Sequence, residues 1–461
     1  MPRFPPVMCV GAIAAAIACL VFCGGAPPPA AATAQDWLTA FNAGDVKALK
    51  ALGDDSADFD ADIREETGGL NLARIASNDG KTVRMLLRER VSPATWHVTL
   101  MRDAKKPERF SYIHRSADAL PSEKDTIASV DAFATRLVHK DKFAGVLLVR
   151  KDGHDLSTKA YGTMDAAEKV PMTLDTKIFF ASQGKMFTAV SIFQLIEKGR
   201  VSLNDTVGKF LPDYPNRTIA KKVTVRMLLA HTAGGGDMGI LQPEDGANRA
   251  RVHSLADIIA LNDKRGPAFE PGTKWDYSNY DYILLGAIIE KASGISFYDY
   301  VQRNIFDRAG MTQTGYPLRE NMTGIAIPMW PKDGKKLVSA MDMWPWRGTP
   351  AGGGVTTAGD EARFVDALNA GKLISKSSLS LATHAPGGFG FQPGNGFGLG
   401  FIESGVHNNK YWGHGGGAHG DSLALGYYPA THMTFVCMAN REPPACDRIG
   451  MSFVFRLPRS K

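Results

Sequence analysis

The sequence predicts an α/β protein of the α+β type: an antiparallel sheet flanked by helices, with a helical insert and a smaller α+β domain before it. Three observations support this prediction. Strand-like apolar stretches occur near both ends of residues 125–461, and apolar residues at helical spacing dominate residues 180–380. Residues 35–120 read as a helix followed by several strands. Strands at both ends with helices between them are typical of one sheet assembled around an insert.

The smaller domain, residues 35–120, is expected to begin with an amphipathic helix at 36–52. Its apolar side would carry Trp37, Leu38, Phe41 and Leu49. Strands are then expected at 70–76, 82–89, 96–101 and 110–114. A helix followed by a meander resembles a shortened nuclear-transport-factor-like or cystatin-like fold. The segment holds no catalytic constellation, so we expect it to serve in packing or partner contact.

A polar hinge at 116–125 leads into the larger domain, residues 125–461. Two strand-like segments, 143–149 and 156–161, flank the turn signal Asp152-Gly153 and predict a β-hairpin. Late strands are expected at 399–403, 411–413, 423–428 and 434–438. The sheet of this domain is therefore expected to combine strands from its two ends.

The composition is that of an ordinary globular protein, with 44% hydrophobic and 22% charged residues among 461. The formal charge of +6 is spread thinly along the chain. The densest basic patch, from Lys105-Lys106 to Arg109, lacks the interleaved aromatic residues that nucleic-acid grooves use. We therefore expect no nucleic-acid partner.

Residues 1–34 are typical of a cleaved export signal. Arg3 supplies a positive start, residues 7–22 are apolar, and Ala32-Thr33-Ala34 forms a small-x-small cleavage site before Gln35. The apolar run is short for a bilayer span, which favours cleavage over an uncleaved anchor. The anchor and lipid attachment at Cys23 remain the alternatives. We expect an exported, periplasmic or cell-envelope protein without stable membrane insertion after cleavage.

Cleavage would leave two cysteines, Cys437 and Cys446. An oxidising compartment permits a disulfide between them. Cys437 equally fits a buried strand residue, and both interpretations stay open.

The most informative motif is Ser182-Gln183-Gly184-Lys185, the only S-x-x-K in the chain, which stands where the apolar helix at 186–196 begins. Helix positions three apart share a face. A hydroxyl nucleophile and an amine able to take its proton would therefore lie side by side, which is how a serine is activated for acyl transfer.

Two more clusters follow, Tyr277-Ser278-Asn279 and Trp412-Gly413-His414-Gly415-Gly416-Gly417. In this order the three clusters resemble the signatures of the serine β-lactamase and penicillin-binding superfamily. The nearest likenesses are class C β-lactamases, the related D-alanyl-D-alanine carboxypeptidases and family VIII esterases. The resemblance covers roughly residues 125–455 and implies a β-lactamase/transpeptidase-like fold with the site between sheet and helical part.

The resemblance implies a role for each motif residue. Ser182 would be the nucleophile, Lys185 its base once burial lowers the pKa of the amine, and Tyr277 a second proton carrier. Asn279 would bind substrate and help to fix Lys185. The backbone N–H groups of Ser182 and Gly417 would form the oxyanion hole, while Gly416 would let substrate approach the strand.

His414 stands where class C β-lactamases carry a lysine. A histidine near its ordinary pKa is partly charged at neutral pH, so we expect weaker, pH-dependent recognition of a substrate carboxylate. This difference favours an esterase or peptidase over an efficient β-lactamase.

No metal and no cofactor are expected. His407, His414 and His419 cluster in sequence but lack the spacing and carboxylates of zinc hydrolases. The glycine triplets are not followed by Walker-type Lys-Ser/Thr, and no Gly-x-Ser-x-Gly elbow occurs.

The sequence thus predicts an exported serine hydrolase that forms an acyl-enzyme with a short-chain ester, a D-amino-acid peptide or a β-lactam. The alternative is a catalytically weak, penicillin-binding-like envelope protein that binds peptidoglycan peptides or a protein partner. Four intact motif side chains argue against that alternative. Loops 242–251 and 329–347 would select the small-molecule or peptide substrate, and the oligomeric state stays open.

Overall fold

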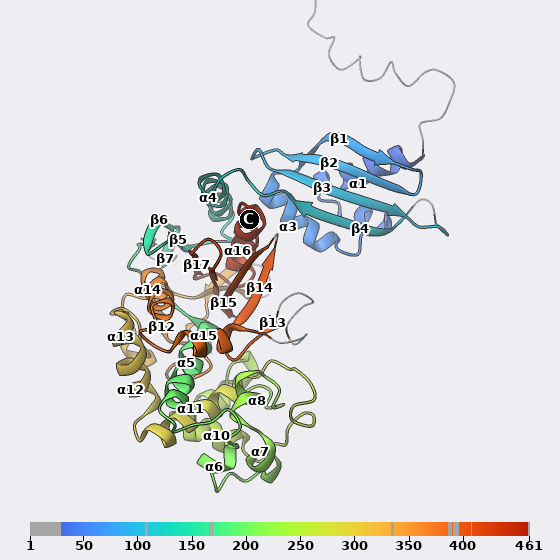
Figure 1. The fold of residues 1–461 in the computed structure, drawn as a ribbon. Coiled ribbons are helices and arrows are strands. Elements are labelled where there is room, and N and C mark those ends of the chain that lie inside the picture. The colour runs from blue at the N-terminus through green and yellow to red at the C-terminus, as the bar shows by residue number, and fades with distance from the viewer. Residues whose placement is uncertain are drawn as a thin grey trace, which may run out of the picture. The chain divides into compact units, whose positions relative to one another are not determined.

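The computed structural model describes residues 29–106, 109–165, 167, 169–332, 336–385, 390, 396–406 and 408–459. Most of the expected export signal, residues 1–28, lies outside the described residues. The chain divides into two compact units, Met1–Leu120 and Pro121–Lys461 (Figure 1). Within the described residues, every helix is too short or too polar to cross a bilayer.

The smaller unit is an antiparallel four-stranded meander with three helices. The strands, in sheet order, are β1 (Leu70–Asn78), β2 (Thr82–Glu89), β3 (Thr95–Arg102) and β4 (Phe110–Ala117). Alternate residues of the two inner strands are buried, including Val83 and Leu87 on β2 and Val98 and Leu100 on β3. This period of two is typical of a strand with one buried face. The four strands predicted from the sequence are all confirmed.

The helices of this unit differ from the expected single helix at 36–52. The structure has α1 (Pro29–Ala43) and α2 (Val46–Ala51), because Gly44 adopts φ 70° and Asp45 caps α2 through the N–H of Ala48. A third helix, α3 (Ala57–Thr67), was not predicted. Its sequence is charged, and Asp60 on α3 is buried by pairing with Arg115 of β4.

The larger unit is built on a seven-stranded antiparallel sheet of order β13-β14-β15-β16-β17-β5-β6 (Figure 1). Its strands are β5 (Gly145–Lys151), β6 (His154–Tyr161), β13 (Gly396–Phe397), β14 (Ile402–Val406), β15 (Asn409–Ala418), β16 (Asp421–Tyr428) and β17 (Met433–Ala439). β5 pairs with β17 so that Leu147 lies opposite Cys437. The prediction that both ends of this domain contribute to one sheet is confirmed.

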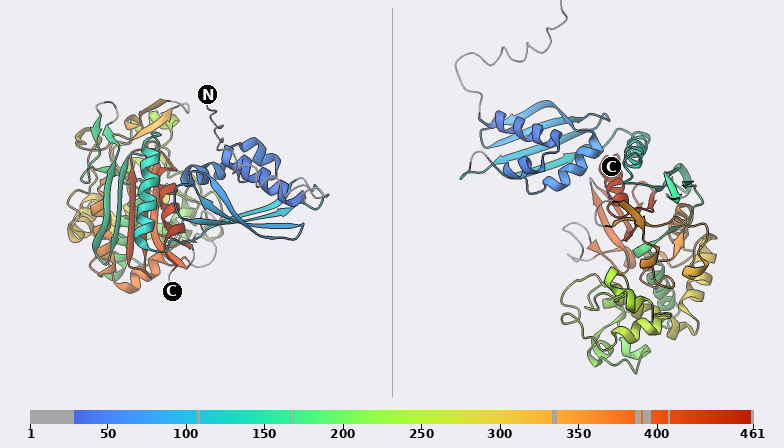
Figure 2. Two further views of the ribbon diagram at one scale, coloured as in Figure 1. Left: turned by 90° about the horizontal axis from the view of Figure 1, so that it is seen from above. Right: turned by 180° about the vertical axis from the view of Figure 1, so that it is seen from behind.

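Helices cover both faces of this sheet, as the views in Figure 2 show. Residues 147 and 149 of β5 and 435 and 437 of β17 pack with α4 (Glu123–Val138) and α16 (Ala445–Arg456). The residues between them, 146 and 148 on β5 and 436 and 438 on β17, join a second core with α5 (Gly184–Glu197), α11 (Asn279–Ser293) and α14 (Ala358–Asn369). Both strands are therefore buried on two sides, which explains their almost continuous apolar sequence.

The helical part lies between the β5–β6 hairpin and the late strands in sequence. Its remaining helices are α6 (Val207–Phe210), α7 (Arg217–Lys222), α8 (Val225–Leu229), α9 (Gly246–Arg249), α10 (Leu255–Asn262), α12 (Phe297–Val301), α13 (Asp307–Ala309) and α15 (Lys376–Thr383). Short helices of other types are η1 (Ala181–Gln183), η2 (Pro243–Asp245), η3 (Gln302–Phe306), η4 (Arg319–Asn321) and η5 (Met341–Met343). Ser, Thr or Asn side chains cap the first turns of α7, α8, α10, α11, α12, α14 and α15.

Three two-stranded ribbons complete the unit. They pair β7 (Thr163–Asp165) with β8 (Val170–Pro171), β9 (Ile178–Phe179) with β12 (Val355–Thr356), and β10 (Met329–Lys332) with β11 (Lys336–Ser339). The β9–β12 ribbon brings the chain just before Ser182 against the glycine triplet 352–354.

Candidate active site

Ser182 lies on the short helix η1, directly before the buried helix α5. The preceding Ala181 has φ 39°, a left-handed conformation that costs energy for a residue with a side chain. Backbone hydrogen bonds oppose this cost: Gly353 N donates to Ala181 O at 3.2 Å, and Phe180 N donates to Gly354 O at 2.9 Å. The glycine triplet therefore holds the turn that presents the Ser182 hydroxyl.

Lys185 lies one turn further on and is fully buried, with 0% of its surface exposed. Its Nζ lies 3.3 Å from Ser182 Oγ, 2.8 Å from Asn279 Oδ1 and 2.8 Å from the carbonyl oxygen of Ala351. Burial lowers the pKa of Lys185 to about 7, while the charge of Asp237 acts in the opposite direction. The neutral form of this amine is therefore accessible near neutral pH.

The three contacts of Lys185 fit the three N–H donors of an ammonium, and they fit a neutral amine as well. Such an amine has two N–H donors and one lone pair. Asn279 Oδ1 and Ala351 O can only accept, and they are the nearer two. With both N–H groups directed at them, the lone pair is left for the hydroxyl hydrogen of Ser182. This arrangement can carry out general-base activation of a serine nucleophile.

Tyr277 is half-buried beside this pair. Its ring centroid lies 4.7 Å from Lys185 Nζ. Burial raises the pKa of Tyr277 far above its ordinary value, although a hydrogen bond with the Ser182 side chain acts in the lowering direction. Tyr277 is therefore a neutral phenol at pH 7 that can relay a proton but does not start as the base.

His231 supports the segment that carries Tyr277 and Asn279. Its Nδ1 accepts a hydrogen bond from the Ser278 N–H at 3.1 Å, and its ring lies 4.4 Å from that of Tyr277. Burial holds the pKa of His231 well below its usual value, so the ring is neutral. Ser278 also caps α11 through the N–H of Asp281, and Asn279 is the first residue of that helix.

Two groups near Lys185 were not identified from the sequence: the carboxylate of Asp237 and the backbone carbonyl of Ala351. Asn279 Nδ2 donates to Asp237 Oδ1 at 3.4 Å, which orients the amide oxygen towards Lys185. The contact from Ala351 is a backbone carbonyl, which no residue type reveals. A second Tyr-x-Asn triplet, Tyr214-Pro215-Asn216, has other roles. The hydroxyl of Tyr214 is hydrogen-bonded to that of Tyr280, and Asn216 caps α7.

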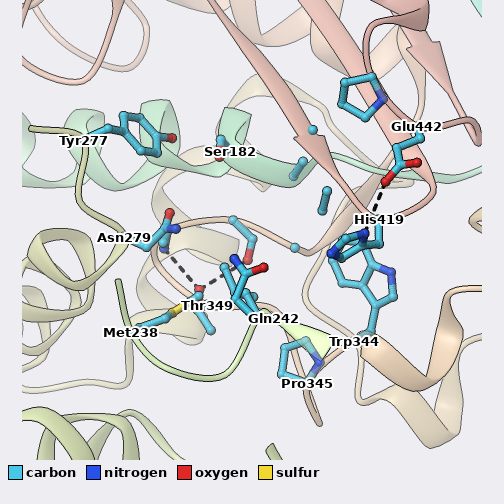
Figure 3. Close-up of a pocket in the computed structure, with 18 residues that line it drawn as sticks. Ser182, Met238, Gln242, Tyr277, Asn279, Trp344, Pro345, Thr349, His419 and Glu442 are labelled. Atoms are coloured by element: carbon cyan, nitrogen blue, oxygen red, sulfur yellow. Dashed lines mark hydrogen bonds and ion pairs between the residues drawn. The ribbon is translucent and has the colours of Figure 1, made fainter. Parts of the chain in front are cut away.

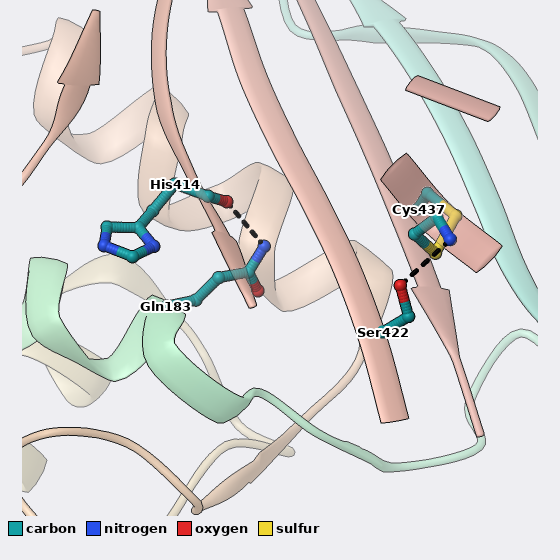
Figure 4. Close-up of a disulfide and its surroundings, with 5 residues drawn as sticks. Gln183, His414, Ser422 and Cys437 are labelled. Atoms are coloured by element: carbon teal, nitrogen blue, oxygen red, sulfur yellow. Dashed lines mark hydrogen bonds between the residues drawn. A yellow bond between two sulfur atoms is a disulfide. The ribbon is translucent and has the colours of Figure 1, made fainter. Parts of the chain in front are cut away.

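The expectation that His414 is partly charged at neutral pH and meets a substrate carboxylate is wrong. The imidazole is 3% exposed on the interior strand β15, and it does not line the cavity described below. Burial lowers the pKa of His414 to about 3, and the charge of Lys185 acts in the same direction. Its ring packs against Phe397, and its carbonyl accepts a hydrogen bond from Gln183 Nε2 at 3.1 Å (Figure 4).

The two glycines predicted for substrate binding occupy different places. A Cβ atom on Gly416 would lie 3.2 Å from Ser182 N, so Gly416 packs against the nucleophile turn and does not line the cavity. Gly417, the next residue on β15, does line the cavity together with Ser182. Close contact between β15 and the turn at 181–183 thus brings the two expected oxyanion-hole residues to one site.

A half-open cavity of about 460 Å³ lies in front of Ser182 (Figure 3). Tyr277 and Asn279 stand at one end, His419 and Glu442 stand at the other, and Ser182 lies between them. The walls between them are mostly apolar and come from several loops: Met238, Leu241, Gln242, Trp344, Pro345, Thr349, the segment 351–353, Ala418 and Pro443. Both loops expected to select the substrate, 242–251 and 329–347, contribute to these walls.

A disulfide joins Cys437 on β17 to Cys446 at the start of α16 (Figure 4). The N–H of Cys446 also donates to Ser422 Oγ on β16 at 3.0 Å. These links hold α16 on the sheet close to the loop that carries Glu442. Both open interpretations of Cys437 hold together, since it is a fully buried strand residue that forms a disulfide.

Of the three histidines that cluster in the sequence, His407, His414 and His419, the first lies outside the described residues. Within the part of the chain that the structure describes, no three His, Cys, Asp or Glu side chains are arranged to hold a metal ion.

Comparisons with known proteins agree with this geometry. The family model described as Beta-lactamase matches residues 130–452. The chain is 36% identical over 179 residues to penicillin-binding protein 4* of Bacillus subtilis, which covers 39% of each chain. It is 29% identical over 276 residues to PbpX of Bacillus subtilis, a protein named for penicillin binding, across 58% of this chain and 64% of that one. The matches therefore span from about two fifths to just under two thirds of these relatives.

Solved structures show the same fold. A penicillin binding protein from Bacillus halodurans superposes with a TM-score of 0.62 at 25% identity, over 69% of this chain and 98% of that chain. The D-amino acid amidase from Ochrobactrum anthropi SV3, complexed with L-phenylalanine amide, superposes with a TM-score of 0.62 at 22% identity, over 72% and 97%.

Proposed function

The chain belongs to the beta-lactamase family, and from this premise we propose that it is an exported serine hydrolase that acts through an acyl-enzyme on Ser182. The observation that carries the proposal is the triple contact of the buried Lys185 amine with Asn279 Oδ1, Ala351 O and Ser182 Oγ. A lysine held solely for charge pairing would face a carboxylate. Here it faces two neutral acceptors and a hydroxyl.

The reaction would begin when the Ser182 hydroxyl hydrogen passes to the lone pair of Lys185 while Oγ bonds to the substrate carbonyl carbon. The carbonyl oxygen then becomes an oxyanion, for which the N–H groups of Ser182 and Gly417 are the proposed donors. The bond from carbon to the leaving group breaks, and that group takes a proton from Lys185 through the Tyr277 phenol. Water, with its proton taken by the same amine, releases the acyl group and restores Ser182.

The substrate class we propose is an ester or amide: a short-chain ester, a D-amino-acid peptide or a β-lactam. The relatives named for penicillin binding support a peptide or β-lactam, and the D-amino acid amidase fold neighbour supports an amide. A neutral, buried His414 supports an ester or amide without an obligatory carboxylate, because this position then offers no positive charge.

The test combines turnover with intact mass. Purified protein is treated with a chromogenic cephalosporin and with p-nitrophenyl esters of increasing acyl length, and the protein mass is followed. We expect a transient acyl adduct that peptide mapping places on Ser182. Ser182→Ala should abolish adduct and turnover, whereas Ser380→Ala, the same change at an exposed serine of α15, should keep both.

Two results would contradict the proposal. Turnover that survives Ser182→Ala would exclude Ser182 as nucleophile. A stable adduct without turnover would instead favour the non-hydrolytic binder of peptidoglycan peptides.

Export is proposed from residues 1–34 and is tested separately. Expression of the full chain with its own leader, followed by mass measurement of the envelope fraction, should give a mature protein that begins at Gln35. A protein that retains its first residues in the membrane fraction would support the anchor instead.

A further inference from the structure

The end of the cavity away from Tyr277 and Asn279 carries an ordered pair of side chains. His419 Nδ1 lies 3.2 Å from Glu442 Oε1, and the two side chains are 28% and 29% exposed (Figure 3). The ring of Trp330 packs against His419 with centroids 4.8 Å apart. Trp330 lies on strand β10, next to Met329. The N–H of Met329 donates to the carbonyl of Gly420 at 3.2 Å, which ties this strand to the β15–β16 turn. The pair is therefore a built feature of the cavity.

The charge at this end is negative or neutral. The described residues that line the cavity include no lysine and no arginine. With a neutral imidazole the pair of His419 and Glu442 carries one negative charge, and with a protonated imidazole it carries none. Lys185 is fully buried behind Ser182, and His414 lies outside the lining. Arg441, next to Glu442 in the chain, is also outside the lining; it is buried and donates to the carbonyl of Asp141 and to Asn440 Oδ1.

A second carboxyl group, that of Asp421, lies near Glu442 but is turned into the protein. Asp421 is fully buried in the β15–β16 turn, where its Oδ1 accepts from the Ala418 N–H at 2.7 Å. Burial raises the pKa of Asp421 to about 8, and the charge of Glu442 contributes to the rise. Asp421 does not line the cavity, so Glu442 is the carboxyl group that faces it. One contact with His419 leaves most of the acceptor sites of that carboxylate for a ligand.

We propose that this cavity takes an acyl donor that carries a free ammonium group, such as an unblocked amino-acid amide, ester or peptide, and that Glu442, oriented by His419, binds the ammonium. The proposal rests on the proposed function and names the substrate class of the same site. The apolar walls, among them Met238, Leu241 and Trp344, accommodate the body of such a substrate. A substrate carboxylate at this end would meet Glu442 without a compensating cation and is disfavoured.

The test compares matched substrates that differ only in charge. Alanine p-nitroanilide, in both its D and L forms, is compared with its N-acetyl derivative, and p-nitrophenyl acetate reports acylation without an amine. We expect kcat/KM of the wild type to favour the unblocked anilide over the acetylated one by about 10- to 100-fold, the worth of one charge-assisted hydrogen bond. Glu442→Gln should reduce this ratio to within a few-fold of one.

Two further variants test whether the ratio of kcat/KM values depends on Glu442 and its imidazole partner. Glu123→Gln, the same change on α4 at a residue paired with Lys151, should preserve the wild-type ratio. His419→Gln keeps the Glu442 charge but removes its imidazole partner, and it should reduce the ratio by less than Glu442→Gln. The second variant also provides the readout if Glu442→Gln fails to fold.

The outcomes separate this inference from the proposed function. Equal kcat/KM for blocked and unblocked anilides, or an unchanged ratio in both variants, overturns the ammonium site while ester turnover on Ser182 upholds the hydrolase. Absence of any acyl adduct with anilide, ester or cephalosporin overturns the hydrolase, and the ammonium site with it.

Discussion

The side-chain oxygen of Asn279 lies 2.8 Å from the amine of Lys185. The amide nitrogen of the same side chain reaches Asp237 at 3.4 Å, so one asparagine joins a buried amine to a carboxylate. The amine is affected in two opposite ways. Burial lowers its pKa, and the charge of Asp237 keeps the pKa from falling further. The balance between these effects determines the pH range in which Lys185 can act as a base.

Removal of the Asp237 charge should extend activity to lower pH. Only the neutral amine can accept the Ser182 proton, so kcat/KM of the wild type should rise with pH through about 7, the pKa of Lys185. Asp237→Asn removes the influence that raises this pKa and should move the rising limb down by about one pH unit. Profiles of kcat/KM against pH measure the shift. Asp213→Asn, at an exposed aspartate, should leave the limb in place, and an upward shift in Asp237→Asn would refute the assignment of Lys185 as base.

The opposite change at Asn279 should restrict activity to higher pH. Asn279→Asp puts a carboxylate beside the amine, stabilises the ammonium form and raises the pKa of Lys185. The rising limb of kcat/KM should move up by about one to two pH units, with activity largely recovered above it. Asn204→Asp, an exposed position, is the matched control. Loss of activity at every pH would mean that Asn279 acts chiefly on the substrate.

Lys185 should also affect stability in a way that depends on pH. The folded protein releases this proton at about 7, and the unfolded chain near 10.5. Between these values only the unfolded chain holds the proton, so raising the pH favours the folded state. Relative to Lys185→Met, the free energy of unfolding of the wild type should therefore increase by about 1.36 kcal/mol per pH unit from pH 7.5 to 9.5. Urea unfolding at several pH values measures this difference. Lys372→Met, at an exposed lysine, provides the comparison, and a flat difference for Lys185→Met would contradict a lowered pKa.

Gly352 should tolerate no side chain. A Cβ atom there would lie 1.8 Å from the Ala181 carbonyl oxygen, and Gly352 has φ 142°. Gly352→Ala should destabilise the protein by more than about 2 kcal/mol and lower kcat, because the turn holding Ser182 must move. Gly359→Ala is the control, since its new Cβ would come no closer than 3.7 Å to any neighbour and it lies within α14. Thermal unfolding and kcat are measured for both variants. Equal stability and equal kcat in Gly352→Ala and Gly359→Ala would contradict the prediction.

Much of the fold follows from local apolar patterns. Strand β2 has the predicted bounds, Thr82–Glu89, because alternate burial leaves a clear signal in the sequence. Helix α3 was missed because it is buried partly through the pairing of Asp60 with Arg115, and a charged helix shows no apolar face. The helix expected at 36–52 was drawn through Gly44, whose left-handed φ ends α1.

The candidate site likewise contains residues that the sequence motifs predict and residues that only the folded structure brings together. Ser182, Lys185, Tyr277 and Asn279 are close together in the structure, as their motifs predicted. The carbonyl of Ala351 and the pair of His419 and Glu442 could not be found from the sequence, because they meet only through long-range packing. The substrate role of His414 was inferred from its place in the motif, which does not reveal that its side chain is buried on β15, between β14 and β16.

The bond between the two sulfur atoms at 437 and 446 ties the last helix to the middle of the sheet. Thiols oxidise outside the cytoplasm and stay reduced within it. A copy of this chain retained in the cytosol would therefore lack the tie beside the loop carrying Glu442. The compartment in which the protein matures therefore affects how rigidly this wall of the cavity is held. Recombinant protein made in a reducing host should be reoxidised before its substrate selectivity is measured.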